Sequence, residues 1–202
     1  METTAKTSRG EAKRRLLLAQ GAGMFMENGY HGTGIQEVVD RVKVPKGSFY
    51  NYFDSKEHFA IEVIRFCAAR TMTDLDEQLQ NTDVEALELI ANCFERQACH
   101  CEASEFREGC IFGNLAAEVA ESSDACRHAV ASAMEAMGRK YLAVLERGQR
   151  EGTVRSDVPA DELAGLLLNA WEGAVLRMKV VKSKKPLEQV VDLLMGRFFR
   201  PS

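Results

Sequence analysis

Apolar residues recur at helical spacing along almost the whole of this 202-residue chain. One eight-residue stretch shows the pattern in its simplest form, with apolar side chains at positions i, i+3, i+4 and i+7 of a helix: Ile35, Val38, Val39 and Val42. Three of the four prolines stand at expected helix starts, where the missing N–H group is tolerated: Pro45, Pro159 and Pro186. No alternating strand pattern or internal repeat competes with this periodicity. The sequence therefore predicts an all-α fold of about nine helices.

The N-terminal segment predicts short helices with clearly marked ends. The first helix should end near Gly29, because glycine readily adopts the left-handed conformation of a C-terminal cap. Thr33 then fits a capping box, in which its hydroxyl accepts from a free N–H group and the Gln36 side chain reaches back. Pro45 should open a third, short helix. Either of two residues can cap the fourth helix, namely Asp54 or Ser55.

Charge is divided unevenly along the chain, although the formal net charge is only −4. Residues 1–56 carry nine Lys/Arg and six Asp/Glu, a net of +3, whereas the remainder carries 17 and 24, a net of −7. A basic N-terminal segment attached to an acidic body indicates a local anionic partner. We therefore expect the N-terminal helices to bind an anion such as DNA.

A capped helix, a tight connection and a second short helix are typical of a helix-turn-helix, whose second helix enters the major groove of DNA. Lys46 and Lys56 would then neutralise phosphates, and Gly47 would let a sugar-phosphate strand come close. Ser48 and Asn51 stand nearest to the base edges. Two phenylalanines are expected in the core, Phe49 and Phe53. The full set of expected DNA contacts is Thr33, Pro45, Lys46, Gly47, Ser48, Tyr50, Asn51, Tyr52 and Lys56.

The segment from about Leu17 to Phe59 resembles the DNA-binding domain of the TetR family of transcriptional regulators. One departure is Pro45, which stands where the family often has serine and which removes a possible phosphate donor. The resemblance implies a helix-turn-helix domain at residues 1–56 and an effector-binding and dimerisation domain at residues 57–202. The matching residues are Phe25, Gly29, Tyr30, Thr33, Ile35, Val38, Val44, Lys46, Gly47, Phe49, Tyr50, Tyr52, Phe53, Lys56 and Glu57.

The resemblance also implies how such a protein works. A homodimer would bind a pseudo-palindromic double-stranded operator and would be released by a small-molecule effector. The last two helices would pair with their copies in a four-helix bundle. The residues expected at this dimer interface are Leu163, Leu167, Ala170, Ala174, Leu187, Val191, Leu194 and Phe198.

Two stretches of the body, residues 109–115 and 170–174, resemble repressors that sense acrylate or reactive electrophiles such as N-ethylmaleimide. The resemblance implies that Cys110 can be a reactive sensor, and a position near a helix start would lower the pKa of its thiol. A packed cysteine lining an apolar pocket is the simpler alternative. Glu118 could supply a polar contact in a pocket, although a surface or capping role is simpler. The candidates for pocket or sensor are Cys110, Phe112, Asn114 and Trp171.

No apolar stretch approaches the roughly 18 residues needed to cross a membrane, so we expect a cytoplasmic protein. Its six cysteines are then free thiols rather than a disulfide framework. Their spacing does not predict a zinc site, and we expect no metal, no cofactor and no enzymatic activity. Two functions remain open. The first is a ligand- or electrophile-responsive DNA-binding repressor, and the alternative is a thiol-based sensor or scavenger whose DNA binding is incidental.

Overall fold

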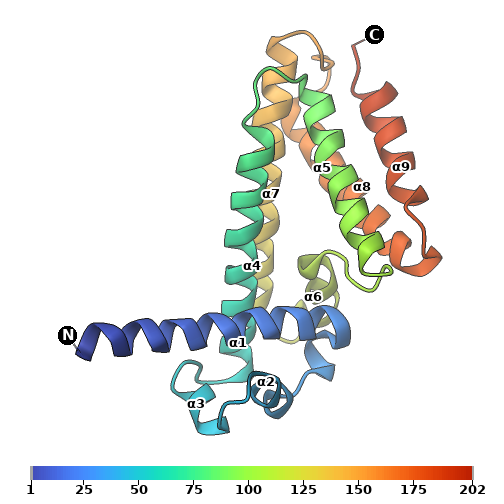
Figure 1. The fold of residues 1–202 in the computed structure, drawn as a ribbon. Helices are drawn as coiled ribbons and strands as arrows, with labels where there is room; N and C mark the ends of the chain where they lie inside the picture. Colours follow the sequence, from blue (N-terminus) through green and yellow to red (C-terminus); the bar gives the residue numbers. More distant parts are fainter. Residues whose placement is uncertain (1, 202) are drawn as a thin grey trace. The chain divides into compact units, whose positions relative to one another are not determined.

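The computed structural model describes residues 2–201, and within that range every regular element is a helix (Figure 1). The prediction of an all-α fold with about nine helices is confirmed. None of the described helices has both the length and the apolar character needed to span a membrane. The elements are α1 (Glu2–Gly32), α2 (Ile35–Val42), α3 (Lys46–Tyr50), α4 (Lys56–Leu79), α5 (Ala86–Ala103), α6 (Ile111–Val119), α7 (Asp124–Arg150), α8 (Ala160–Val181), α9 (Lys185–Val190) and the π-helix η1 (Val191–Phe198).

The chain packs into two compact units, which we describe separately. The first unit contains Met1–Ala69 and Ile111–Ala133, and the second contains Arg70–Cys110 and Met134–Ser202. The boundaries fall inside α4 and α7, and α6 belongs with the N-terminal helices. Packing thus divides the chain differently from the predicted functional boundary after residue 56, and that functional boundary stays a prediction.

A cluster of phenylalanine rings holds the N-terminal helices together. Phe49 and Phe53 are fully buried, and their ring centres lie 5.1 Å and 4.9 Å from that of Phe59. Phe25 of α1 joins the cluster at 5.9 Å from Phe59. A Cβ at Gly21 would overlap the Phe59 ring, so this close approach of α1 requires a glycine. The prediction that Phe49 and Phe53 belong to the core is confirmed.

The junction between α1 and α2 is built around Gly29, whose φ of +74° interrupts the helical dihedrals of α1 near the predicted helix end. Thr33 is buried, and its hydroxyl donates to the Gly29 carbonyl at 2.8 Å. The start of α2 is capped instead by the Gly34 N–H, which donates to the Glu37 carboxylate at 3.1 Å. The predicted capping box of Thr33 and Gln36 is therefore wrong. Carbonyls left free where α1 is interrupted are the nearer partners for the Thr33 hydroxyl.

A tight turn joins α2 to α3. Lys43 ends α2 in the left-handed conformation, with a φ of 56°. Pro45 then precedes α3 as its N-cap at a φ of −61°, so the predicted start of this helix is confirmed within one residue. Ser55 caps α4, because its hydroxyl accepts the His58 N–H at 3.0 Å. The helix α3 is therefore only five residues long, and the sequence marks its start with Pro45.

In the second unit, α8 packs against α9, and α5 packs against both α9 and η1 (Figure 1). Phe94 of α5 lies 6.0 Å from the ring of Tyr141 on α7 and 6.3 Å from the ring of Trp171 on α8. All three side chains are buried. This aromatic group joins three helices of the unit and forms much of its interior.

Candidate nucleic-acid interface and effector region

The helix α3 exposes its basic and polar residues while its aromatic anchor is buried. Lys46, Gly47 and Asn51 are exposed, and Tyr50 keeps 49% of its surface exposed. Phe49 on the same short helix is fully buried in the phenylalanine cluster. The remaining two candidates in this segment are half-buried, Ser48 and Tyr52. One face of α3 thus packs into the protein interior while the opposite face is exposed to solvent, as insertion of a helix into a DNA groove requires.

Gly47 has no neighbour in the protein that would exclude a larger side chain. A Cβ built on it would meet no atom within 4 Å. Glycine inside a helix is about 1 kcal/mol less favourable than alanine, so its presence here is not explained by internal packing. Close approach of an external surface to the backbone is a physical reason for a glycine at this position.

Two of the predicted contacts have partners inside the protein. Thr33 is buried, and its hydroxyl donates to the Met24 and Gly29 carbonyls of α1, so its side chain is engaged within the protein. The Lys56 ammonium lies 4.6 Å from the centre of the Tyr30 ring, within the range of cation–π attraction. Burial lowers the pKa of Lys56, and the Glu118 and Glu37 carboxylates act in the opposite direction. A phosphate would therefore compete with these groups for Lys56.

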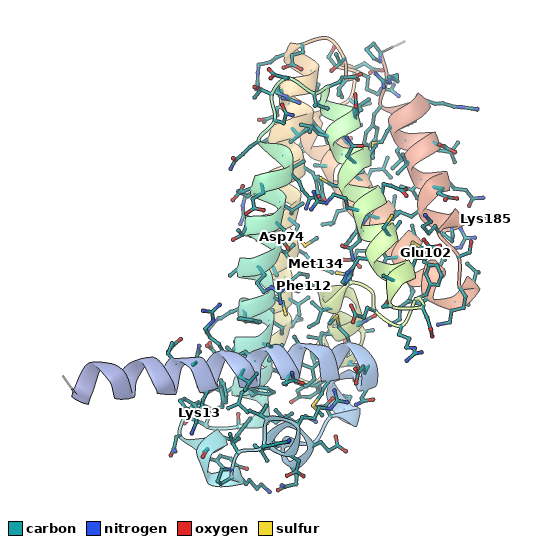
Figure 2. The ribbon with its side chains drawn as sticks, viewed as in Figure 1. Lys13, Asp74, Glu102, Phe112, Met134 and Lys185 are labelled. Carbon is teal, nitrogen blue, oxygen red and sulfur yellow. The ribbon has the colours of Figure 1, made fainter. Side chains whose placement is uncertain are left out.

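The basic residues of the first unit fall into two groups. Arg14 pairs with Glu62, and Arg41 pairs with Glu27 at 2.8 Å, so these charges are partly satisfied. Three lysines are exposed and form no ion pair within the described residues, namely Lys13 (labelled on α1 in Figure 2), Lys43 and Lys46. These lysines remain available to an external anion.

Cys110 is buried and immediately precedes α6, at the helix start that the sequence predicts. The Glu172 carboxylate accepts a hydrogen bond from the Cys110 thiol. Burial raises the pKa of Glu172, and the bond from Cys110 acts in the opposite direction. One Glu172 side-chain oxygen is buried with no hydrogen-bond partner in the described part of the chain. The buried Cys110 thiol and the half-buried Glu172 carboxyl thus form a hydrogen-bonded pair within the second unit.

Four other thiols are held in their protonated form at neutral pH. Burial raises the pKa of Cys93 to about 11, and it also raises those of Cys101 and Cys126. Cys99 is exposed, and its hydrogen bond to the Glu95 carboxylate raises its pKa. These environments disfavour the thiolate, which is the nucleophilic form of cysteine. Within residues 2–201, no group of His, Cys, Asp or Glu side chains is arranged to hold a metal ion.

The four predicted pocket or sensor residues are divided between the two units. Cys110 and Trp171 belong to the second unit, whereas Phe112 and Asn114 lie on α6 in the first (Phe112 is labelled in Figure 2). Trp171 and Phe112 are buried, and Asn114 is half-buried. Each residue is therefore placed within its own unit.

Sequence reasoning missed two residues of this region, Tyr141 and Glu172. Burial raises the pKa of Tyr141 well above its usual value, and Cys93 and Cys110 act in the same direction. The partners of Tyr141 and Glu172 stand far away in the sequence. Glu172 lies in the stretch 170–174 named above, but its pairing with Cys110 is not visible there.

Comparison with known families decides the identity of the chain. The model described as bacterial regulatory proteins, tetR family, matches residues 17–63, and the model of the tetracyclin repressor-like C-terminal domain matches residues 86–194. The chain belongs to the TetR family of transcriptional regulators. It is accordingly a DNA-binding regulator, and the helix-turn-helix prediction is confirmed.

Named relatives of this TetR-family regulator extend over nearly the whole chain. The HTH-type transcriptional repressor DhaR of Mycobacterium sp. (strain GP1) is 32% identical over 90% of this chain and 89% of its own length. The transcriptional regulator AcuR of Cereibacter sphaeroides is 31% identical over 91% of this chain and 83% of its own length. The crystal structure of the reduced form of E. coli NemR has a TM-score of 0.85 at 28% identity, covering 92% of this chain and 96% of that one.

The predicted dimer residues of this TetR-family regulator lie on different faces of the C-terminal helices. Phe198 is exposed. Three others are half-buried, Ala170, Val191 and Leu194. The other four predicted residues are buried within their own protomer, namely Leu163, Leu167, Ala174 and Leu187, and the set of interface residues stays a prediction. The large apolar side chains that α8 and η1 do expose are Leu166, Leu176, Val180, Val181, Leu193 and Phe198.

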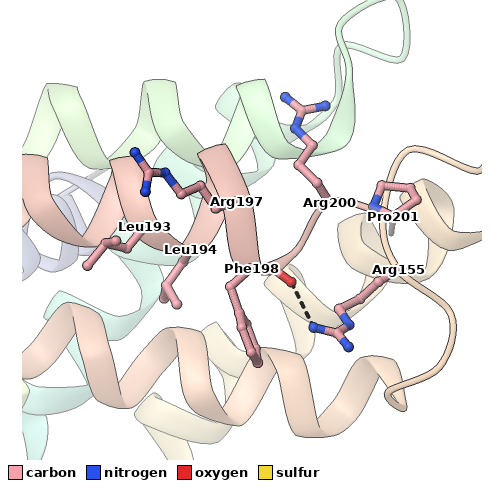
Figure 3. A pocket seen from close by; sticks show the side chains of 7 residues that line it. All are labelled: Arg155, Leu193, Leu194, Arg197, Phe198, Arg200 and Pro201. Carbon is pink, nitrogen blue, oxygen red and sulfur yellow. Dashed lines mark hydrogen bonds between the residues drawn. The ribbon is translucent and has the colours of Figure 1, made fainter.

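An open groove of about 520 Å³ lies at the end of η1 (Figure 3). The Arg155 guanidinium lies 4.9 Å from the Phe198 ring, donates to the Phe198 main-chain oxygen at 3.1 Å and pairs with Asp157 at 2.6 Å. Arg200 pairs with Glu85. Carboxylates thus offset two of the three arginines in this groove, which leaves it weakly cationic. The full lining is Arg155, Leu193, Leu194, Arg197, Phe198, Arg200 and Pro201.

Proposed function

We propose that this protein is a transcriptional repressor that binds a pseudo-palindromic operator as a homodimer and leaves it when an effector acts on its C-terminal domain. The observation that carries the proposal is the exposed surface of α3, where Lys46, Gly47 and Tyr50 project from a helix anchored by the buried Phe49. The relatives DhaR and NemR are named repressors, which supports repression over activation.

In this proposal the residues in and next to α3 make different kinds of contact with DNA. Lys46 neutralises a phosphate, and Gly47 allows the sugar-phosphate strand to approach the backbone. The Tyr50 ring and hydroxyl are exposed and suit contact with a phosphate or a thymine methyl group. Ser48 and Asn51 are the candidates for base edges. Flanking contacts are assigned to Pro45, Tyr52 and Lys56.

A dimer is proposed because one short helix reads only one half-site. Helix-turn-helix dimers read two half-sites whose centres are about 34–36 Å apart, one turn of DNA. An exposed apolar stripe along α8 supplies a surface for a second copy, with Leu176 61% exposed and Val180 77% exposed. Leu193 and Phe198 extend the apolar surface onto η1. An isologous pairing of these helices would bury these side chains.

The effector is proposed to act on the second unit, which contains an aromatic interior, the buried Cys110 thiol and the half-buried Glu172 carboxyl. Phe94, Tyr141 and Trp171 suit an apolar or aromatic small molecule. Cys110 is the candidate for covalent modification, because it immediately precedes α6, where the partial positive charge of a helix start favours a thiolate. This position also supports the second candidate function, a thiol-based electrophile sensor.

Selection of an operator from random DNA tests the repressor proposal. We expect enrichment of an inverted repeat, and we expect Lys46→Ala to weaken binding while reducing the slope of log Kd against log salt by about 1. Lys185→Ala is the matched control, because this exposed lysine lies on α9 (Figure 2) and should not change the affinity. Fluorescence anisotropy at several salt concentrations measures both quantities. Enrichment of single half-sites alone, or equal affinity of the Lys46 variant and wild type, would count against the proposal.

Alkylation tests the sensor role of Cys110. N-ethylmaleimide should release the wild-type protein and the Cys99→Ser variant from the operator, and Cys110→Ser should remain bound. Mass spectrometry confirms which thiol carries the adduct. If Cys110→Ser is released as readily as wild type, the sensor role is rejected while operator binding is unaffected.

A further inference from the structure

The C-terminal end of α6 is fastened to the junction between α1 and α2 by one carboxylate. Glu118, the penultimate residue of α6, accepts the His31 N–H at 3.0 Å. This N–H lies just beyond the positive-φ residue Gly29, where the helix of α1 is interrupted. The contact joins residues 87 positions apart in the chain. All of these residues belong to the first unit.

Glycine at position 29 is needed for this contact as well as for the backbone conformation. A Cβ on Gly29 would collide with the Glu118 carboxylate, which lies directly against the glycine Cα. The other side of Gly29 is also held, because its carbonyl accepts the Thr33 hydroxyl at 2.8 Å. The Glu118 carboxylate and the Thr33 hydroxyl therefore both contact Gly29, and α2 begins two residues after Thr33.

Further contacts strengthen the same junction. The His31 Nε2 atom lies 3.3 Å from the Glu118 main-chain oxygen, one of the last carbonyls of α6 that need a partner outside the helix. The Glu118 carboxylate is also close enough to act on Lys56, the first residue of α4. Ser123, in the turn after α6, donates to the Glu57 carboxylate. One end of α6 thus touches both the helix that precedes the helix-turn-helix and the helix that follows it.

We propose that Glu118 is the positioning residue that couples α6 to the orientation of the helix-turn-helix. This inference rests on the proposed function, since it describes how DNA binding and the state of the effector domain influence each other. A movement of α6 must either carry the Gly29–Thr33 segment with it or break the hydrogen bond to His31. The α6 helix begins directly after Cys110, so a change at that residue is only a short distance along the chain from the contact between Glu118 and His31.

Thermodynamic reciprocity gives a test that needs no effector. If Glu118 couples the helix-turn-helix to α6, operator binding must change the free energy of opening α6, because a coupling free energy is the same in both directions. Hydrogen exchange followed by mass spectrometry is measured on the full-length protein with and without saturating operator DNA. In wild type we expect the operator to slow exchange over residues 111–119 at least threefold, and Glu118→Ala should show less than 1.5-fold slowing.

The matched control is Glu121→Ala, which removes an exposed carboxylate three residues further along that forms no hydrogen bond or ion pair within the described residues. It should keep the full threefold slowing. If Glu118→Ala does not fold, Glu118→Asp replaces it, because aspartate keeps the charge but is one methylene too short to reach the His31 N–H. Equal slowing in wild type and the Glu118 variant, or no slowing in wild type, overturns the proposal.

This experiment tests the contact between Glu118 and His31 independently of the proposed effector response. A protein that ignores every ligand and alkylating agent contradicts the effector part of the proposed function. The comparison between the Glu118 and Glu121 variants is still decisive in that case, because it uses only protein and operator.

Discussion

The short helices α2 and α3 and the long helix α8 all bury an apolar face, but α8 also exposes several large aliphatic side chains. Gly29, Pro45 and Ser55 mark helix ends in the first region, and the two helices between Gly29 and Ser55 are short. On α8, Leu167 is buried while Leu176 is 61% exposed. Helix ends are set by residues within the helix, whereas the direction of an apolar face is set by partners elsewhere in the chain. Local signals therefore predict the first region better than the second.

The adjacent aromatics Phe49 and Tyr50 give the largest contrast within one helix. Phe49→Ala should lower the free energy of unfolding by about 3–5 kcal/mol, because it leaves a cavity in a fully buried ring cluster. Tyr50→Ala removes a half-exposed ring and should lower it by less than about 1 kcal/mol. Urea denaturation followed by circular dichroism at a fixed protein concentration measures both. Equal destabilisation by the two variants would show that α3 does not have separate buried and exposed faces.

The two faces of α8 can be separated in the same way. Leu167→Ala should destabilise the protein by about 2–5 kcal/mol, because this side chain is fully buried in its protomer. Leu176→Glu should leave each protomer folded and should convert the dimer to monomer, because it places a charge in the apolar stripe proposed as the interface. Sedimentation velocity reports the oligomeric state. A Leu176→Glu protein that stays dimeric would place the interface on another surface.

The sequence predicted which residues bound each N-terminal helix, but it did not predict which side chain makes each bond. Thr33 was expected at the cap of α2, yet the Gly34 N–H and the Glu37 carboxylate form it. The pattern permits both, and the interruption of α1 at Gly29 decides between them by offering free carbonyls to Thr33. The spacing of residues in the sequence does not show which free carbonyls a hydroxyl will reach.

The candidate site was predictable to the extent that it is local. The α3 residues Lys46 and Tyr50 are exposed as a helix-turn-helix requires, and they stand beside one another in the sequence. Glu118 meets His31 across 87 residues, and Glu172 meets Cys110 across the body of the chain. Contacts of this length depend on how whole helices pack, so the pairing of these residues could not be read from a motif.

Gly47 offers a case in which stability and binding should move in opposite directions. Gly47→Ala has room for its methyl group and should raise the free energy of unfolding by up to about 1 kcal/mol through helix propensity. The same methyl group should weaken operator binding about tenfold, or about 1.4 kcal/mol, if DNA lies against this backbone. Denaturation and anisotropy on one preparation measure the two effects. If the Gly47→Ala variant is more stable but binds the operator with unchanged affinity, the DNA strand does not lie against Gly47.

The smallest expected effect distinguishes the two possible caps of α2. Glu37→Ala removes the carboxylate that accepts the Gly34 N–H, and it should destabilise the protein by about 0.5–1 kcal/mol. Gln36→Ala removes only an exposed bond from its Nε2 to Asp40 and should change stability by less than about 0.5 kcal/mol. Differences of this size need paired urea titrations of both variants with wild type on the same day. If the Gln36 variant is the less stable one, the cap predicted from the sequence forms in solution, and Thr33 must then leave the Gly29 carbonyl to make it.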